Sequence, residues 1–290
     1  MSKQWEKIYR PKYISGYNPF IIKNMNKAIE KVVNAINLRK KIVIYGLCDV
    51  DGICALSSLI LLLKYLNGDV EYCIEDYSHK NHLIKEEDIK NRIHFLGADL
   101  LIAVGCNFKS KRELELSKAL GIETIIMENS KPESVQDTIY INPNQTGCSY
   151  RYKNLSNSAL TFKLMQAIAI YYNMNSINKY LDLIFIGSVY KKSEKKGENK
   201  VFLNEGISYL RKTNNYGLRA ILDYLKIDFI EKRDVESIIN LLTPMNNSVS
   251  VMDTAKIIVE LLITSDLGRA AQIVKYLNFE RKKQVVGGTS

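Results

Sequence analysis

Short apolar runs alternate with amphipathic segments along the first half of the chain. The runs are four to six residues long and rich in Ile, Leu and Val, which is typical of buried strands. The predicted strands are 41–45, 69–74, 100–104, 123–127 and 138–141. Helical spacing at 53–66 and 111–120 separates them. This alternation predicts parallel crossover connections, and therefore an α/β fold with a mostly parallel, doubly wound sheet.

The two ends of the chain have different patterns. Residues 1–17 are polar and basic and are expected to form an arm, and a helix is predicted from Asn18, because Asn18 and Pro19 are helix-start signals. After residue 150 only helical patterns occur, apart from a basic loop at 190–200. The predicted helices are 156–172, 177–189, 201–212, 217–225, 235–242, 252–264 and 267–284. We therefore expect an α/β core at 18–150 and a mainly helical second part at 151–290, ending in a connector helix.

Composition restricts the class of protein. The chain has 290 residues, of which 46% are hydrophobic and 25% charged, so it can form one large or two small globular domains. We find no signal-peptide pattern, and the apolar runs are too short to span a bilayer, so we expect a cytoplasmic protein without a membrane partner. The cysteines have no CxxC spacing and are expected to be buried free thiols. They are Cys48, Cys54, Cys73, Cys106 and Cys148.

The net charge of +10 and the pI of about 9.2 favour polyanionic partners, since clustered Lys and Arg replace the counterions of phosphates. One cluster of lysines is denser than the rest of the chain. It consists of Lys191, Lys192, Lys195, Lys196 and Lys200. A phosphate-binding surface and an ordinary solvated loop both remain open for it.

The most informative local pattern follows the first predicted strand. Gly46 ends the strand, Asp49 and Asp51 follow two positions apart, and Gly52 leads into a helix. Turns at the carboxyl ends of strands in α/β sheets are the usual ligand sites. Two interpretations remain open: the two acids hold a divalent metal, or Asp51 caps the helix that follows.

The order of these segments resembles a known family. The segments are KIVIYG with DVDG, INPNQTGCSYRYKNLSNSAL, YLDLIFIGSV, GENK and LLITSD. Together they resemble the catalytic region of the RecJ-like single-strand-specific exonucleases, which belong to the DHH phosphoesterases. The resemblance spans nearly all of 18–284. It implies a DHH α/β domain with a helical second part, and hydrolysis of phosphodiesters with two divalent metals, usually manganese. It also implies a DHH-associated second domain, which we expect this chain to lack.

The resemblance also implies where metal ligands should lie, and most of those positions are altered. Asp49 and Asp51 are retained. The other positions are Leu47, Gly105, the Asp-His-His equivalents Glu128, Asn129 and Ser130, and Lys191. Two dications need about four or more anionic or imidazole ligands. We therefore predict no intact catalytic set and, at most, one weakly bound Mn²⁺ or Mg²⁺ at Asp49, Asp51 and Glu128.

These substitutions predict a non-catalytic RecJ-like protein that acts as a binding or scaffolding module in DNA replication or repair. Its partner would be single-stranded nucleic acid, a nucleotide or another protein, with Lys191 and the neighbouring lysines contacting phosphate. Two alternatives remain open. One is a metal-dependent phosphodiesterase or single-stranded-DNA exonuclease with a reduced metal site. The other is a subunit whose cleft is completed by another chain.

Other candidate chemistry is sparse. His79 and His82 are three residues apart, and Asp76 precedes them, so a separate metal site and a polar surface loop both remain open. Cys106 is a candidate nucleophile, but no histidine is near it in sequence, so we expect a buried thiol. We find no GxSxG, HExxH or P-loop pattern.

Overall fold

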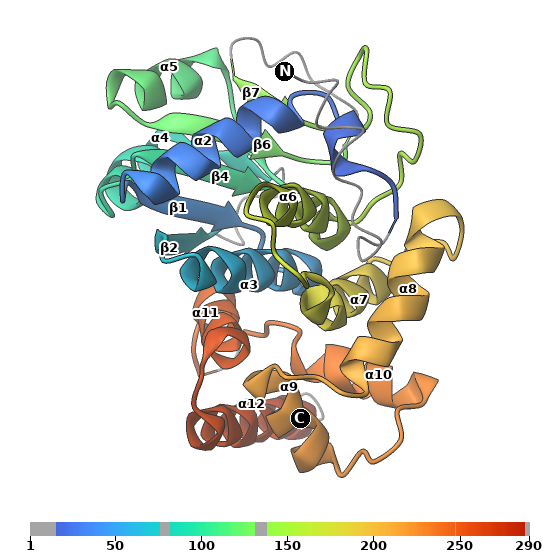
Figure 1. The fold of residues 1–290 in the computed structure, drawn as a ribbon. Coiled ribbons are helices and arrows are strands. Elements are labelled where there is room, and N and C mark those ends of the chain that lie inside the picture. The colour runs from blue at the N-terminus through green and yellow to red at the C-terminus, as the bar shows by residue number, and fades with distance from the viewer. Residues whose placement is uncertain (1–15, 76–81, 131–137, 247, 288–290) are drawn as a thin grey trace.

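The computed structural model describes residues 16–75, 82–130, 138–246 and 248–287. Its centre is a parallel five-stranded sheet in the order β2-β1-β4-β6-β7 (Figure 1). The strands are β1 (Lys41–Gly46), β2 (Asp69–Ile74), β4 (Leu100–Val104), β6 (Glu123–Met127) and β7 (Ile139–Ile141). The predicted strands are thus confirmed. Because the strand order reverses between β1 and β4, a crevice is expected at their carboxyl ends.

Helices cover both faces of the sheet, which is why the strands are apolar at nearly every position. Ile42 and Ile44 point into the larger apolar cluster, and Val43 and Tyr45 point into the smaller one. The first face carries α2 (Met25–Asn37), α3 (Val50–Tyr65) and α6 (Asn157–Tyr171). The second carries α4 (Glu86–Asp88), the π-helix η2 (Ile89–His94) and α5 (Lys111–Ala119). The predicted doubly wound arrangement is therefore confirmed.

A second, two-stranded parallel sheet pairs β3 (Leu83–Ile84) with β5 (Asn107–Phe108). The sequence pattern did not predict these strands, because two residues are too few to show a periodicity.

The second half of the chain is helical, as predicted (Figure 1). After the short helix η3 (Asn178–Tyr180), its helices are α7 (Leu181–Tyr190), α8 (Gly197–Leu210), α9 (Tyr216–Leu225), α10 (Lys232–Leu241), α11 (Val251–Ile263) and α12 (Leu267–Gly287). The α7 and α11 helices pack on α3, and the larger apolar cluster runs from the sheet into these helices. The boundary at residue 150 stays a prediction. None of the helices in the described ranges is long and apolar enough to cross a membrane.

Several predicted boundaries are wrong; the helix expected at 177–189, for example, is divided into η3 and α7. The helix expected from Asn18 is divided into η1 (Pro19–Ile21) and α2, because Asn24 has a left-handed backbone with φ of 68°. The expected basic loop at 190–200 is shorter, since α8 begins at Gly197. Burial of Glu198 in the first turn of α8 holds that turn in place.

A buried ion pair connects α6, α8 and the start of the described chain. Lys163 Nζ lies 2.8 Å from Glu198 Oε1, and both side chains are fully buried. The Lys163 ammonium also donates to the Tyr17 carbonyl oxygen, while the Tyr17 backbone N–H and the Tyr150 hydroxyl donate to Glu198. Residues 1–15 of the predicted arm lie outside the described residues.

A second buried acid, Asp182, lies in the first turn of α7. Thr213 Oγ1 donates to its Oδ2 at 2.5 Å, and the Leu183 backbone N–H donates to its Oδ1 at 2.7 Å. Burial raises the pKa of Asp182 to about 6, although these two donors act to lower it. The folded protein therefore binds this proton more tightly than the unfolded chain does. The resulting stabilisation is present at low pH and is lost as the pH rises through about 6.

We expect Asp182→Asn to remove this pH dependence, because the amide carries no charge. Its oxygen still accepts from the Leu183 N–H, and its NH2, which takes the place of Oδ2, donates to the Thr213 hydroxyl oxygen. Relative to the parent protein, the free energy of unfolding of the variant should increase by about 2 kcal/mol between about pH 4 and pH 7. Urea denaturation at each pH measures the difference. A difference that stays constant across this range contradicts the prediction.

Candidate functional site

A cavity of about 410 Å³ lies at the carboxyl ends of β1 and β4, beside the loop after β6 and the first turn of α6. It brings together most of the positions singled out in the sequence. Those that line it are Leu47, Asp51, Gly105, Glu128, Asn129, Ser130, Lys191 and Lys192. The other lining residues are His82, Asn154, Leu155, Ser156, Asn157, Ser193 and Glu194. Asp49 borders the cavity through its contact with Lys191. Lys195, Lys196 and Lys200 do not line it.

Asp49 makes two contacts that occupy both of its carboxylate oxygens. Its Oδ1 accepts from the backbone N–H of Gly52 at 2.8 Å, so Asp49 is the N-cap of α3. Its Oδ2 lies 2.8 Å from Lys191 Nζ. Partial burial acts to lower the pKa of Lys191, but the Asp49 carboxylate prevails and raises it above its ordinary value. Lys191 therefore remains a cation bound to Asp49.

Asp51 is fully buried and contacts a different helix. Its Oδ2 accepts from the backbone N–H of Asn157 at 2.8 Å, and its Oδ1 accepts from the backbone N–H and the hydroxyl of Ser158 at 2.9 and 2.6 Å. Burial raises the pKa of Asp51 to about 6, although the Ser158 and Asn157 donors counteract it. The carboxylate lies at the positive end of α6. The hypothesis that Asp51 caps the following helix is wrong: Asp49 caps α3, and Asp51 binds the start of α6.

Glu128 is directed into a hydrogen-bonded network at the end of β6. The Asn107 amide donates to Glu128 Oε1 at 3.1 Å, and the Tyr140 hydroxyl donates to the same oxygen. Asn142 in turn donates to the Tyr140 hydroxyl at 2.8 Å. These contacts link Glu128 to β5 and β7, and none of them joins it to Asp49 or Asp51.

Asn129 and Ser130 hold neighbouring loops together. Asn129 Nδ2 donates to the Leu155 carbonyl oxygen at 2.6 Å, and its Oδ1 accepts from Asn144 Nδ2 at 2.9 Å. The Ser130 carbonyl oxygen accepts from Asn142 Nδ2 at 3.0 Å. Both ends of the Asn129 amide thus hold neighbouring loops in place.

A side chain at Gly105 would displace its neighbours. Its φ is +77°, and a Cβ added there lies 2.6 Å from Asn157 Nδ2 and 2.8 Å from Leu47 Cδ1. Leu47 is itself buried in the smaller apolar cluster. Two implied ligand positions are thus filled by an apolar side chain and by the Asn157 amide.

The donor set does not fit a two-metal centre. Within the described ranges, no three His, Cys, Asp or Glu side chains are grouped so that they can hold a metal ion. Asp49 is paired with a cation, Asp51 receives donors on both oxygens, and Glu128 is bound by Asn107 and Tyr140. A binuclear centre needs these oxygens to face two ions.

The structure adds one polar pair that the sequence patterns did not identify. His82 Nδ1 lies 2.9 Å from Glu75 Oε2; Glu75 is buried, and His82 lines the cavity. The position of Glu75, directly after β2, is a signal that points to this edge of the sheet. His82 has a left-handed backbone and is not part of a helix. His79 and Asp76 lie outside the described residues.

The cysteines behave as the sequence indicates. All five are free; Cys148 is half-buried and the other four are buried. Burial raises the pKa of the Cys106 thiol well above its usual range, and nearby acids raise it further. Cys106 is therefore a buried protonated thiol, unsuited to nucleophilic attack.

Residues 41–188 match the family model described as the DHH family, N-terminal domain, and the chain belongs to that family. Within it, the chain is a homologue of RecJ. It is 29% identical over 275 residues to the single-stranded-DNA-specific exonuclease RecJ of Bacillus subtilis, a match that covers 93% of this chain and 34% of the relative. The chain thus spans about a third of that relative's length.

Solved structures show the same fold. A crystal structure of exonuclease RecJ bound to manganese matches with a TM-score of 0.81 and 20% identity, covering 91% of this chain and 67% of the other. RecJ from Thermus thermophilus in complex with Mn²⁺ matches with a TM-score of 0.76 and 20% identity, covering 91% and 38%. These relatives bind manganese, and at this identity they establish the fold alone.

Proposed function

We propose that this chain is a non-catalytic RecJ-like protein that binds single-stranded nucleic acid, as a module of DNA replication or repair. One observation carries the proposal: the Lys191 ammonium is bound to Asp49, 2.8 Å away, among the positions that the family uses for metal ligands. A cation fixed there repels a metal ion and attracts a phosphate. For a single weakly held Mn²⁺ or Mg²⁺ to bind at Asp49, the Lys191 ammonium must first move away from that carboxylate.

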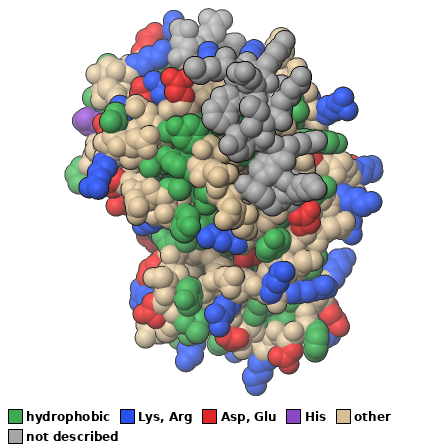
Figure 2. Space-filling view, viewed as in Figure 1, with side chains coloured by type: hydrophobic (Ala, Val, Ile, Leu, Met, Phe, Trp, Pro, Cys, Tyr) green, Lys and Arg blue, Asp and Glu red, His purple; other side chains and the backbone are tan. Residues whose placement is uncertain are grey.

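The basic side chains near the cavity supply the attraction for phosphates. Lys192 lines the cavity, while Lys195 follows in the turn and Lys200 lies in α8. Within the described residues, none of these three makes an ion pair. Lys196 lies 3.4 Å from Glu194. Figure 2 shows Lys and Arg side chains along the margin that α8 occupies in Figure 1. Unpaired lysines of this kind release counterions when they contact a nucleic-acid backbone.

We expect a fluorescein-labelled single-stranded oligonucleotide to bind with an affinity that falls as salt rises. The pair Lys192→Ala with Lys200→Ala should weaken binding and reduce the slope of log K against log salt by about 1.4, because each phosphate contact to a single strand contributes about 0.7. Fluorescence anisotropy at several salt concentrations measures both. The matched control is Lys232→Ala with Lys275→Ala, which removes equal charge from exposed positions on α10 and α12. If the two double variants lose the same oligonucleotide affinity, the lysines near the cavity are not the binding interface.

The alternative function is a phosphodiesterase with a reduced metal site. Under the proposal, we expect no cleavage of the labelled strand in Mn²⁺, Mg²⁺ or Co²⁺, because the carboxylates lack the geometry for metal catalysis. Gel electrophoresis of the strand after incubation tests this. Manganese-dependent cleavage that disappears when Asp49→Ala and Asp51→Ala are combined supports the alternative and contradicts the proposal.

A further inference from the structure

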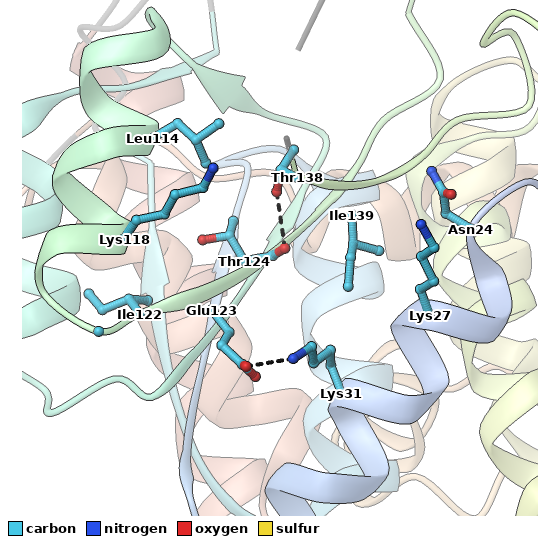
Figure 3. Close-up of a pocket in the computed structure, with 11 residues that line it drawn as sticks. Asn24, Lys27, Lys31, Leu114, Lys118, Ile122, Glu123, Thr124, Thr138 and Ile139 are labelled. Carbon is cyan, nitrogen blue, oxygen red and sulfur yellow. Dashed lines mark hydrogen bonds and ion pairs between the residues drawn. The ribbon is translucent and has the colours of Figure 1, made fainter. Parts of the chain in front are cut away.

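A second cavity lies at the other end of the sheet. It has a volume of about 690 Å³ and lies at the amino ends of β6 and β7, between α2 and α5 (Figure 3). None of its lining residues lines the first cavity. Ligands of α/β proteins usually bind at the carboxyl ends of strands, so the fold alone does not explain a cavity here.

Lysines from both helices surround this cavity. Lys27 and Lys31 come from α2, and Lys118 extends from α5 toward Thr138 (Figure 3). Lys31 Nζ lies 2.6 Å from Glu123 Oε1, whereas Lys27 and Lys118 have no hydrogen-bond or ion-pair partner in the described part of the chain. Three ammonium groups against the one carboxylate leave a net charge of +2 around the cavity. Among the described residues of the lining, no other side chain is charged.

The uncharged lining is divided into a hydroxyl side and an apolar side. The Thr124 hydroxyl oxygen is buried without a hydrogen-bond partner, which is costly unless a ligand supplies one. The Thr138 hydroxyl donates to the Thr124 carbonyl oxygen at 3.1 Å. Leu114, Ile122 and Ile139 contribute apolar surface. The cavity therefore offers cationic, hydrogen-bonding and apolar contacts within one space.

We propose that this cavity binds a nucleotide, with its phosphates between Lys27 and Lys118 and its base against the apolar side. The volume lies in the range of small-molecule sites, about 300–1,000 Å³. Lysine binds phosphate as a point charge, and two unpaired lysines match the charge of a phosphate group. A nucleic-acid strand instead requires a continuous basic groove with stacking side chains, and none of the described residues that line this cavity is aromatic.

The inference is independent of the proposed function, because the two cavities share no residue. Isothermal titration calorimetry with ATP, GTP, CTP and UTP tests it on the full chain. We expect at least one of them to bind, and Lys27→Ala with Lys118→Ala to weaken that binding at least tenfold. Both lysines are exposed, so the variant is expected to keep the parent's melting temperature. The control pair Lys232→Ala with Lys275→Ala should bind as the parent protein does.

Two further comparisons separate this site from less specific explanations. Tripolyphosphate, which has the phosphates but no base, should bind at least tenfold more weakly than the best nucleotide. The Lys192→Ala, Lys200→Ala variant should bind that nucleotide normally, even if it no longer binds the oligonucleotide. Three results overturn the inference. None of the four nucleotides binds, or tripolyphosphate binds as tightly as the best nucleotide. The third is that the Lys192→Ala, Lys200→Ala variant loses nucleotide binding while the Lys27→Ala, Lys118→Ala variant keeps it.

Discussion

Replacing Lys163 by Met is expected to lower the free energy of unfolding by about 3–5 kcal/mol, because it leaves a buried carboxylate without its cation. Lys163 and Glu198 are both 0% exposed and lie 2.8 Å apart. The Lys163 ammonium also holds the Tyr17 carbonyl, so the variant loses a link to the start of the described chain. Urea denaturation at neutral pH, followed by circular dichroism, measures the loss.

Two companion variants test the cause. Combining Lys163→Met with Glu198→Gln should recover part of the lost stability, since the unpaired charge is removed. The amide oxygen still accepts from the Tyr17 N–H, and the amide NH2 donates to the Tyr150 hydroxyl oxygen. Lys31→Met serves as the control for an exposed pair: Lys31 and Glu123 are 38% and 37% exposed, and the loss should stay below about 1 kcal/mol. If Lys163→Met and Lys31→Met cost the same, the buried pair does not have the role assigned to it.

Gly105→Asp, which restores an acid that the family resemblance implies, is expected to destabilise the protein by about 2–5 kcal/mol. Two costs add up. The left-handed backbone at φ +77° costs a non-glycine residue about 1–2 kcal/mol. The new Cβ also lies 2.6 Å from Asn157 Nδ2 and 2.8 Å from Leu47 Cδ1, and overpacking of this kind costs about 1–3 kcal/mol.

Gly97 provides a matched control for this variant. Its φ is +76°, and an added Cβ meets nothing within 4 Å, so Gly97→Asp carries the backbone cost without the packing cost. Chemical denaturation of both variants should therefore show the larger loss for Gly105→Asp, by about 1–3 kcal/mol. Equal losses would mean that the space around Gly105 is open. That result would reopen the question of a ligand at this position.

These contacts give structural roles to several residues at positions where the family resemblance implies metal ligands. Asp51 stabilises the first turn of α6 and Asp49 the first turn of α3, so the two acids have structural roles without a metal. Leu47 adds to the smaller apolar cluster. Asp49, Asp51 and Leu47 thus contribute to the folded structure, which is compatible with the proposal of a binding module on a hydrolase scaffold.

The strands, the major helices and the fold class follow from the sequence because burial on both faces of a sheet leaves a local pattern. The run 69–74 predicts β2 with the bounds that the structure has, Asp69–Ile74. Most helices likewise begin or end within a few residues of the predicted positions. The positions implied by the family resemblance converge on one cavity, because the carboxyl ends of parallel strands meet at one edge.

The tertiary structure alone decided which groups pair. Three contacts join residues that are far apart in the chain: Asp49 with Lys191, Asp51 with the start of α6, and Lys163 with Glu198. The cavity between α2 and α5 likewise needs helices from opposite faces of the sheet to meet at its edge. The sequence by itself determined the elements and the edge of the sheet where a site lies. It did not determine the contacts there, since periodicity reports only a residue's own burial, whereas an ion pair depends on how distant elements pack.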